Sequence, residues 1–181
     1  MPSPIAHVAA GYVAYRILRN RLPILAKTLP VFVLFAAVVV LSLLPDCDCV
    51  VGIVAGDFAR CHNNITHSFA AGIAVAVLVA MGMALAKGRE AIQAWFLFGF
   101  ALYGLHVAMD YLTVGRGVMA LWPFLPDRFE SPVCLFRGVK WSWGLWSIEH
   151  LWTLLNESLF VGVLVLLASL MRRRRRAEAK N

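Results

Sequence analysis

Charged residues are scarce in this sequence and are absent from long stretches of it. Asp, Glu, Lys and Arg make up 15% of the 181 residues, apolar residues make up 61%, and the mean hydropathy is +0.74. In soluble globular domains about a quarter of the residues are charged. The scarcity of charge therefore excludes an ordinary soluble protein and predicts a chain that resides in a lipid bilayer.

Motifs that would indicate other classes of protein are missing as well. Cys47, Cys49, Cys61 and Cys134 form neither the paired CxxC pattern of a zinc ribbon nor a haem-attachment motif. Disulfides among them and thiolate ligation of a metal both stay open. The first twenty residues also lack the pattern of a cleaved signal peptide, because the arginines of Arg16–Arg21 follow the apolar stretch. We therefore expect the N-terminus to be retained.

Acidic residues are few compared with basic ones, at ten against seventeen, which gives a net charge of +7 and a pI near 9.7. Such an excess can indicate nucleic-acid binding. Its placement argues otherwise, because Arg172–Arg176 form one run directly after an apolar segment, which is typical of an anchor facing anionic lipid. We expect membrane lipid as a partner and no nucleic acid.

Uncharged runs of nearly membrane length predict an all-α fold, an integral membrane helix bundle of four to five spans. Residues 1–171 are expected to form a single membrane domain, and residues 172–181 a basic tail. A short N-terminal helix is expected over residues 5–18. The four main spans are expected near residues 29–44, 69–86, 91–111 and 149–171.

The short helix over Ile5–Leu18 has two interpretations. Its fourteen residues cover only about 21 Å at about 1.5 Å per residue, so it would form a short or tilted fifth span that carries His7 toward the outer face. The alternative is an amphipathic helix that lies on the cytoplasmic surface.

Most basic residues fall on one side of this arrangement. Arg16–Lys27, Lys87–Arg89 and Arg172–Lys180 hold twelve of the seventeen Lys and Arg residues. The positive-inside rule places that side, with the C-terminus, in the cytoplasm of a multi-pass protein of the bacterial inner membrane. Eight of the ten acidic residues then face outward. Four histidines lie on the same outer side: His62, His67, His106 and His150.

The third expected span carries His106 and Asp110 near its outer end. They stand at positions i and i+4, so a helix places both on one face, where two side chains can bind one ion. Ionisable groups inside a span each cost at least about 2.5 kcal/mol, which makes them candidates for function. A buried hydrogen-bonded pair with a purely structural role is the alternative.

A second motif, Leu44–Asp48, reads Leu-Pro-Asp-Cys-Asp and follows the first span. We expect Pro45 to end the helix and an extended turn to point Asp46 and Asp48 the same way. Two carboxylates this close repel each other, whereas a divalent ion turns the repulsion into coordination. A solvated polar loop is the alternative for this motif alone.

A third motif, His62–Ser68, places two imidazoles, His62 and His67, directly before the second span. Its Thr66 and Ser68 can cap the helix that follows. Imidazole with carboxylate suits zinc, manganese or iron better than calcium or magnesium. Exposed loop histidines are common, but here three separate segments bring His and Asp to one membrane depth. The sequence therefore predicts a metal site at the outer face, with zinc preferred.

In order and spacing these motifs resemble the YdjM-like family of LexA-binding, inner-membrane-associated, predicted metal-dependent hydrolases. The resemblance covers most of the chain: an early His at His7, Leu-Pro-Asp-x-Asp at Leu44–Asp48, and His-x-x-x-Thr-His-Ser spacing at His62–Ser68. A His-x-x-x-Asp block follows at His106–Asp110, with a downstream Leu-Trp-Pro at Leu121–Pro123. The resemblance implies that His7 is a ligand, which favours the inserted form of its helix.

The chain departs from the family pattern at Asn63 and Asn64, where the second element has Arg-Gly. If that Arg binds an anionic group of the substrate, three outcomes are open. Another residue such as Arg60 or Arg116 takes over, the substrate differs, or the activity is reduced.

The candidate ligands exceed what one tetrahedral site needs, so we expect one or two divalent ions, with two favoured. Zinc is the preferred ion and manganese or iron are alternatives. Asp48 and His67 are the predicted catalytic residues. The predicted ligands are His7, Asp46, Asp48, His62, His67, His106 and Asp110.

Such a site would lower the pKa of bound water to about 7 and direct hydroxide at a phosphoryl or acyl group. Because the site opens at bilayer depth, we expect a membrane-bound metal-dependent hydrolase of the phosphodiesterase or phospholipase type, acting on phosphoester or lipid-linked substrates. The alternative is a non-enzymatic metal-binding membrane protein with a regulatory or metal-handling role. A transporter is disfavoured, because Phe69–Ala86 offers no polar path toward the cytoplasm.

A helical or irregular outer segment is expected over Gly115–Ser147. The stretch Trp141–Trp152 holds four tryptophans around Glu149 and His150, which is typical of an interfacial aromatic belt. The alternative is that Glu149, His150 and Glu157 orient ligands or act as a general base.

The predicted topology can be tested with the chain's own cysteines. After reduction, a membrane-impermeant thiol reagent added to intact spheroplasts should label Cys47 or Cys61, because the loop from Asp46 to His67 lies outside. Labelling that needs cell lysis would contradict this topology.

Overall fold

Helices are the regular elements of this chain in the computed structural model, which describes residues 1–56, 62–139 and 148–178. No strand occurs among these residues, so the expected all-α fold is confirmed. In chain order, with η for 3₁₀ helices, the elements are α1 (Pro4–Arg21), α2 (Ile24–Thr28), α3 (Val31–Leu43), η1 (Leu44–Asp46), α4 (Cys47–Val54), η2 (Ile65–His67), α6 (Phe69–Lys87), η3 (Arg89–Ala91), α7 (Ile92–Tyr111) and α8 (Glu149–Glu178).

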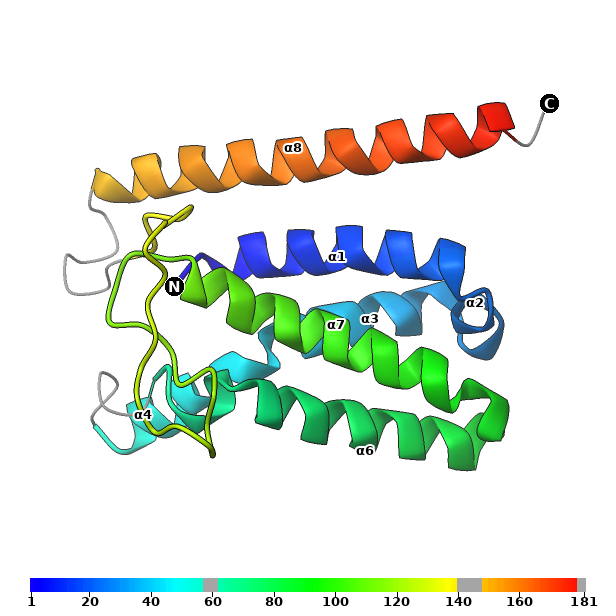
Figure 1. The fold of residues 1–181 in the computed structure, drawn as a ribbon, viewed down its shortest axis with the longest axis horizontal. Coiled ribbons are helices and arrows are strands. Elements are labelled where there is room, and N and C mark those ends of the chain that lie inside the picture. The colour runs from blue at the N-terminus through cyan, green and yellow to red at the C-terminus, as the bar shows by residue number, and fades with distance from the viewer. Residues whose placement is uncertain (57–61, 140–147, 179–181) are drawn as a thin grey trace.

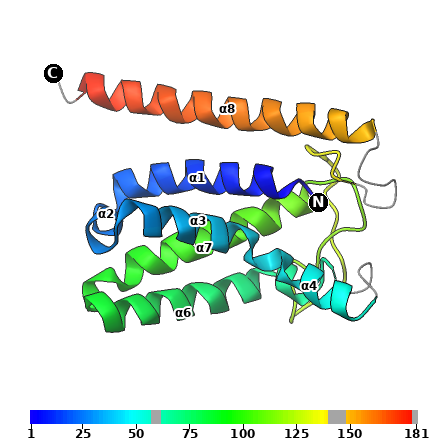
Figure 2. The same ribbon diagram turned by 180° about the vertical axis from the view of Figure 1, so that it is seen from behind.

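Five long helices, α1, α3, α6, α7 and α8, run along one common direction (Figures 1 and 2). Helix α1 packs against α3, α7 and α8, and α6 packs against α7. Consecutive long helices run in opposite directions, so the start of α1, the end of α3, the start of α6, the end of α7 and the start of α8 meet at one end of the bundle. We call this the ligand end.

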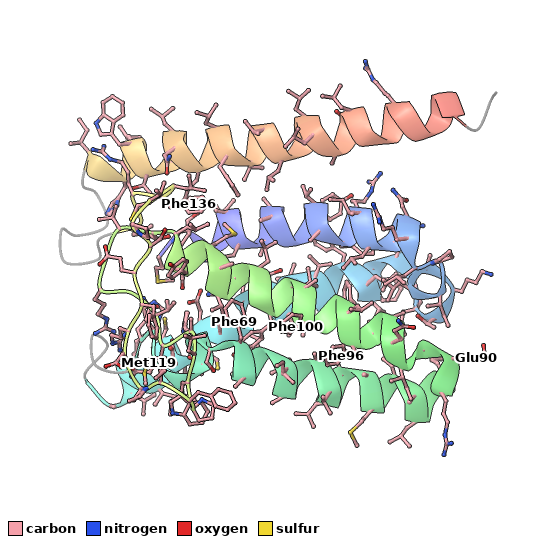
Figure 3. The ribbon with its side chains drawn as sticks, in the orientation of Figure 1. Phe69, Glu90, Phe96, Phe100, Met119 and Phe136 are labelled. Atoms are coloured by element: carbon pink, nitrogen blue, oxygen red, sulfur yellow. The ribbon has the colours of Figure 1, made fainter. Side chains whose placement is uncertain are left out.

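The basic segments lie at the opposite end. Helix α1 ends there with Arg19 and Arg21, and α6 ends there with Lys87. Glu90 in η3 also lies there, far from Met119 and Phe136 at the ligand end (Figure 3). Helix α8 continues through the arginine run to Glu178, so most of the basic tail extends the last helix.

Four helical segments are long and apolar enough to cross a membrane. Their outward side chains include Leu78 and Leu85 of α6, which are 68% and 90% exposed. An apolar surface this extensive is satisfied by lipid and not by water. The protein is therefore an integral membrane helix bundle. The four segments are Val31–Val54, Phe69–Lys87, Arg89–Tyr111 and His150–Leu170.

Helix α1 is longer than the sequence indicated and lies lengthwise beside the other helices (Figure 1). The Ser3 side chain caps it by accepting a hydrogen bond from the Ala6 backbone N–H. The Ser3 backbone N–H donates to Glu157 Oε1 on α8 at 2.7 Å, and the Ser3 hydroxyl donates to the other carboxylate oxygen. Glu157 is buried, so this carboxylate fastens the start of α1 to α8.

Small residues set the distance between α6 and α7. A Cβ on Gly99 would lie 3.2 Å from the Cα of Ala76, and one on Gly72 would lie 3.0 Å from the Tyr103 ring. Helices in membranes gain most of their packing from such close approaches. The contact fixes α7, which carries His106 and Asp110, against α6.

The expected extended turn after Pro45 is wrong. The chain continues as η1 and then as the short helix α4, so Asp46 ends η1 and Asp48 lies in the first turn of α4. Proline is compatible with this geometry because it stands in the first turn of η1, where its missing N–H is not needed.

The outer segment 112–139 is irregular, with isolated bridges between Thr113 and Phe136 and between Val118 and Phe129. It crosses the ligand end of the bundle (Figure 1). Cys47, Cys49 and Cys134 are not in disulfides, while Cys61 and three of the four belt tryptophans lie outside the described residues.

We predict that Gly99→Val destabilises the bundle, because the new side chain would press on the backbone at Ala76. Overpacking of this kind costs about 1–3 kcal/mol, which thermal unfolding in detergent should detect as a lower midpoint. Gly82→Val is the matched control, since a Cβ on Gly82 meets no atom within 4 Å. Equal midpoints for both variants would show that the α6–α7 contact is not tight.

Candidate metal centre

Two groups of potential metal ligands meet at the ligand end. Asp46, His67, His106 and Asp110 form the first group, and Asp46, Asp48, Cys49 and His62 form the second. In each group the ligand atoms all lie within 4.8 Å of one another, and Asp46 belongs to both. Six of the seven predicted ligands are thus brought together.

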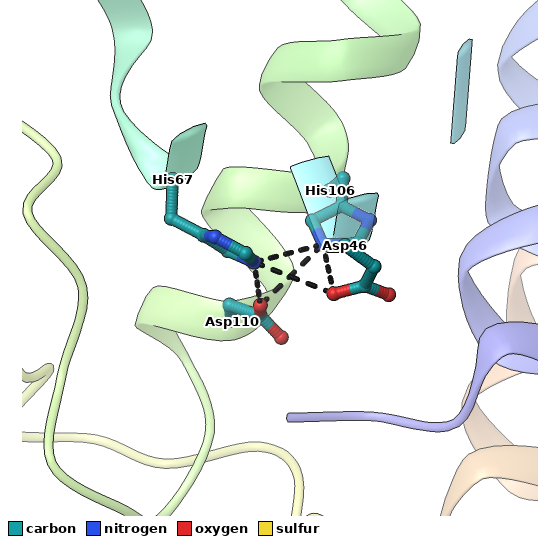
Figure 4. Close-up of side chains that lie close together, drawn as sticks. All are labelled: Asp46, His67, His106 and Asp110. Carbon is teal, nitrogen blue, oxygen red and sulfur yellow. Dashed lines mark hydrogen bonds and ion pairs between the residues drawn. The ribbon is translucent and has the colours of Figure 1, made fainter. Parts of the chain in front are cut away.

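The first group has the spacing of a tetrahedral metal site (Figure 4). His67 Nε2 lies 3.0 Å from Asp110 Oδ2, 3.5 Å from Asp46 Oδ1 and 3.3 Å from His106 Nε2. His106 Nε2 lies 3.4 Å from Asp46 Oδ1 and 3.5 Å from Asp110 Oδ2. Four ligands at about 2.0 Å from a tetrahedral zinc ion would lie about 3.3 Å apart. One ion therefore fits between these four atoms.

The two imidazoles are oriented so that Nε2 faces the centre. Nδ1 of His106 lies 2.6 Å from the Ser42 carbonyl oxygen, which can only accept, so Nδ1 carries the proton. Nδ1 of His67 lies 3.2 Å from Asp48 Oδ2, the arrangement in which a carboxylate orients a metal-binding histidine. Both rings can therefore offer a free Nε2 lone pair to a cation.

Several atoms around this centre are buried without a hydrogen-bond partner. They include both carboxylate oxygens of Asp46, both of Asp110, and both ring nitrogens of His7. The ion-pair distances to His67 and His106 are short, but they do not have hydrogen-bond geometry. Unsatisfied buried carboxylates are costly, and a divalent cation would satisfy them. The residues present therefore fit a metal ion.

The charge of the first group also favours a divalent cation. With neutral imidazoles the first group carries two negative charges, which a divalent cation balances. Burial alone would lower the pKa of His67, but its contacts with Asp110, Asp46 and Asp48 outweigh burial and raise the pKa well above the usual histidine value.

Helix α1 brings His7 to the edge of the first group. Its Nε2 lies 3.5 Å from Asp110 Oδ1, and its ring stacks on the His106 ring with centroids 3.7 Å apart. The side chain is fully buried. His7 is outside both four-residue groups but contacts a ligand of the first.

Asp48 is the best-satisfied carboxylate at this end. Its two oxygens lie 2.8 Å from His62 Nδ1, 3.1 Å from the Asn63 backbone N–H, 2.7 Å from the Thr66 hydroxyl and 3.2 Å from His67 Nδ1. Asp48 therefore links the motif Leu44–Asp48 to the motif His62–Ser68, and it contacts the first ligand group through His67.

The second group adds Cys49, one of the four cysteines for which the sequence left both disulfides and thiolate ligation open. Its Sγ lies 3.2 Å from His62 Nδ1, close to Asp48. Cys49 stands three residues after Asp46, so both share a helical face once the segment is known to be helical. The expectation of an extended turn hid this signal.

The backbone around His67 is held by neighbouring elements. The Tyr103 hydroxyl of α7 donates to the Thr66 carbonyl at 2.6 Å, and Ser68 caps α6 by accepting from the Ala71 N–H at 3.1 Å. The predicted capping role of Ser68 is confirmed, whereas the Thr66 hydroxyl serves Asp48 instead.

Two arginines of the outer segment reach the segment His62–Asn64. Arg116 donates to the His62 carbonyl, and Arg128 donates to the Asn63 carbonyl at 2.8 Å and to the Asn64 side-chain oxygen. Sequence reasoning named Arg116 but missed Arg128, for which no local signal exists. Arg60 lies outside the described residues.

These features define a helical membrane protein with a buried His and Asp cluster at one end of its bundle. The chain belongs to the YdjM inner membrane protein family, whose profile matches residues 1–177. It is also similar to the inner membrane protein YbcI of Escherichia coli strain K12, with 27% identity over 178 residues covering 91% of this chain and 97% of YbcI. No solved structure matches. The resemblance to the YdjM-like family is thus confirmed.

We predict that His106→Ala and Asp110→Ala each remove bound metal, because either change leaves the first group with three ligands. His7→Ala should weaken metal binding less, since His7 belongs to neither ligand group and contacts the first group only through Asp110 and the ring of His106. Metal per chain in the purified protein is the measurement, and His150→Ala, which changes a histidine outside both groups, is the control. Wild-type metal content in the His106 and Asp110 variants would make the cluster purely structural.

Proposed function

We propose that this protein is a membrane-bound metal-dependent hydrolase that acts at the outer face of the bacterial inner membrane on phosphoester or lipid-linked substrates. The spacing of the first ligand group supports the metal, because five ligand-atom pairs lie 3.0–3.5 Å apart around unsatisfied carboxylates. Zinc is the preferred ion for two imidazoles and two carboxylates, with manganese or iron as alternatives.

A bound divalent ion would polarise a phosphoryl or acyl oxygen and acidify water at neutral pH. The chain's own contribution is position. His67 presents Nε2 to the first group while Asp48 holds its Nδ1. We assign the chemistry to these two residues: His67 as ligand, and Asp48 as the carboxylate that fixes the His67 ring by accepting a hydrogen bond from its Nδ1–H.

A second ion is part of this proposal. Asp46 belongs to both ligand groups, and a carboxylate with two oxygens can bridge two cations. The second group is the more open of the two, because Cys49 is only half-buried. The site would therefore admit substrate from the side of Cys49 and Asp48.

Apolar surface around the ligand end favours a lipid substrate. In α4 the side chains of Val51, Ile53 and Val54 are 60–84% exposed while Asp48 is buried. Phe124 in the outer segment is 87% exposed. Such side chains are stable where they dip into the bilayer interface. A substrate held at that depth would carry its reacting group beside the ligands.

Orientation follows from charge. Most of the basic residues belong to segments at the end opposite the ligands, where α1, α6 and α8 end, and the positive-inside rule places that end in the cytoplasm. We therefore propose that the C-terminus is cytoplasmic and that α1 crosses most of the membrane as a fifth helix with His7 near the outer face.

Deep burial of the first group favours one competing function, a non-enzymatic metal-binding protein. The side chains of His67, His106 and Asp110 are 0% exposed, and a closed site is typical of structural metals. The two functions differ in whether a ligand position stays open for substrate.

We predict chelator-sensitive hydrolysis by the purified protein of a phosphodiester or phospholipid substrate. Asp48→Asn should lower the rate about 10–100-fold, because the amide no longer accepts the His67 N–H as a charged partner. Asp127→Asn, an exposed carboxylate of the outer segment, is the matched control. A protein that binds metal stoichiometrically but hydrolyses none of these substrates would favour the non-enzymatic function.

A further inference from the structure

Arg116 and Arg128 converge on one short segment beside the second ligand group. Arg116 donates through Nη2 to the His62 carbonyl. Arg128 donates through Nη1 to the carbonyls of Asn63 and Gly117 at 2.8 and 3.3 Å, and through Nη2 to the Asn64 side chain. One guanidinium group thus contacts the predicted metal ligand His62, and the other contacts Asn63, the next residue in the chain.

These arginines are not neutralised by the described part of the chain. Among the described residues they donate to carbonyl and amide oxygens, and neither forms an ion pair with a described carboxylate. Burial and the like charge of Arg116 both lower the pKa of Arg128, which is consistent with two cations held close together. An anion between them would remove this repulsion.

The arginines also have donors to spare. Each guanidinium carries five N–H groups in a planar fork. The contacts with described residues occupy Nη2 of Arg116 and both terminal nitrogens of Arg128, so Nε of each and Nη1 of Arg116 are available to another acceptor. Arg116 is exposed and Arg128 is half-buried, so a ligand can reach them from the surface.

The pair is coupled to the ligand groups through two short links. His62, whose carbonyl binds Arg116, has its Nδ1 2.8 Å from Asp48 Oδ1. Asn63, whose carbonyl binds Arg128, donates its backbone N–H to Asp48 Oδ2 at 3.1 Å. An anionic group held by the arginines would therefore lie next to the Asp48 side of the site, where the second ligand group is open.

We propose that Arg116 and Arg128 bind the phosphate group of the substrate. The proposal rests on the hydrolase function and names its substrate class, a phosphate ester and not a neutral ester. Guanidinium groups match phosphate oxygens with paired hydrogen bonds, and two of them fix its orientation. Positions 63 and 64 are Asn in this chain and carry no charge. The positive charge beside them comes from Arg116 and Arg128 of the outer segment.

Inorganic phosphate is the probe for the test. Its affinity for the full-length protein in detergent is measured by calorimetry, with and without added zinc, for wild type, Arg116→Gln and Arg128→Gln. Loss of charge-assisted hydrogen bonds should weaken phosphate binding about tenfold or more in each variant, with metal content unchanged. Arg137→Gln, an exposed arginine of the same outer segment, should bind phosphate like wild type.

A second arm identifies the source of the phosphate. Nanodiscs of phosphatidylcholine with or without phosphatidic acid replace the detergent, and competition between phosphatidic acid and inorganic phosphate is measured. If phosphatidic acid competes with inorganic phosphate and the competition depends on both arginines, the natural ligand is a lipid headgroup. If inorganic phosphate binds but phosphatidic acid does not compete, the natural ligand is a soluble phosphate ester.

The failure of this proposal differs from a failure of the hydrolase function. Wild-type phosphate affinity in both variants, or no phosphate binding by the zinc-loaded wild type, would overturn the arginine site even if metal and hydrolysis are present. Metal loss together with phosphate loss in both variants would also overturn it, since the arginines would then serve only to hold His62–Asn64 in place. Arg128→Lys keeps the positive charge but loses the paired N–H donors of the guanidinium group. It should therefore restore only part of the phosphate affinity that Arg128→Gln loses.

Discussion

Two buried carboxylates that lack hydrogen bonds, Asp46 and Asp110, impose the constraint on which the rest of the site depends. Burying an ionised carboxylate costs several kcal/mol unless a positive charge lies against it. The nearest groups are imidazoles, His67 and His106, and not Lys or Arg. A guanidinium would form a permanent ion pair with these carboxylates and could not bind a metal, whereas an imidazole can give up its proton and offer a lone pair to a cation. The choice of histidine therefore keeps the cluster open to metal.

The bundle supplies the precision that such a cluster needs. His106 and Asp110 are one turn apart on α7, and α7 is fixed on α6 by the close approach of Gly99 to Ala76. His67 precedes α6 directly and is tied to α7 by the hydrogen bond from Tyr103 to the Thr66 carbonyl. These two contacts fix His67, His106 and Asp110 relative to one another. The irregular segment 112–139 contributes charge, through its arginines, and not ligands.

Sequence reasoning recovers the parts of this protein that depend on local signals. The spans follow from apolar runs, and the candidate ligands His106 and Asp110 follow from helical spacing alone. Ligation by Cys49 stayed open because its position depends on whether the chain after Pro45 is extended or helical, and proline is compatible with an extended chain and with the first turn of a helix. Arg128 was missed because a loop that returns across the bundle carries no periodic pattern. What the sequence leaves open is therefore set by tertiary packing.

The link between Ser3 and Glu157 has a consequence for biogenesis. The first helix is synthesised before all the others, yet its N-terminal cap is anchored by a carboxylate on the last one. The contact between Ser3 and Glu157 can form only when α8 has been made and inserted. Until then α1 packs against α3 and α7 without this anchor. The order of translation thus leaves the anchoring of α1, the helix that carries His7, until the last helix is in the membrane.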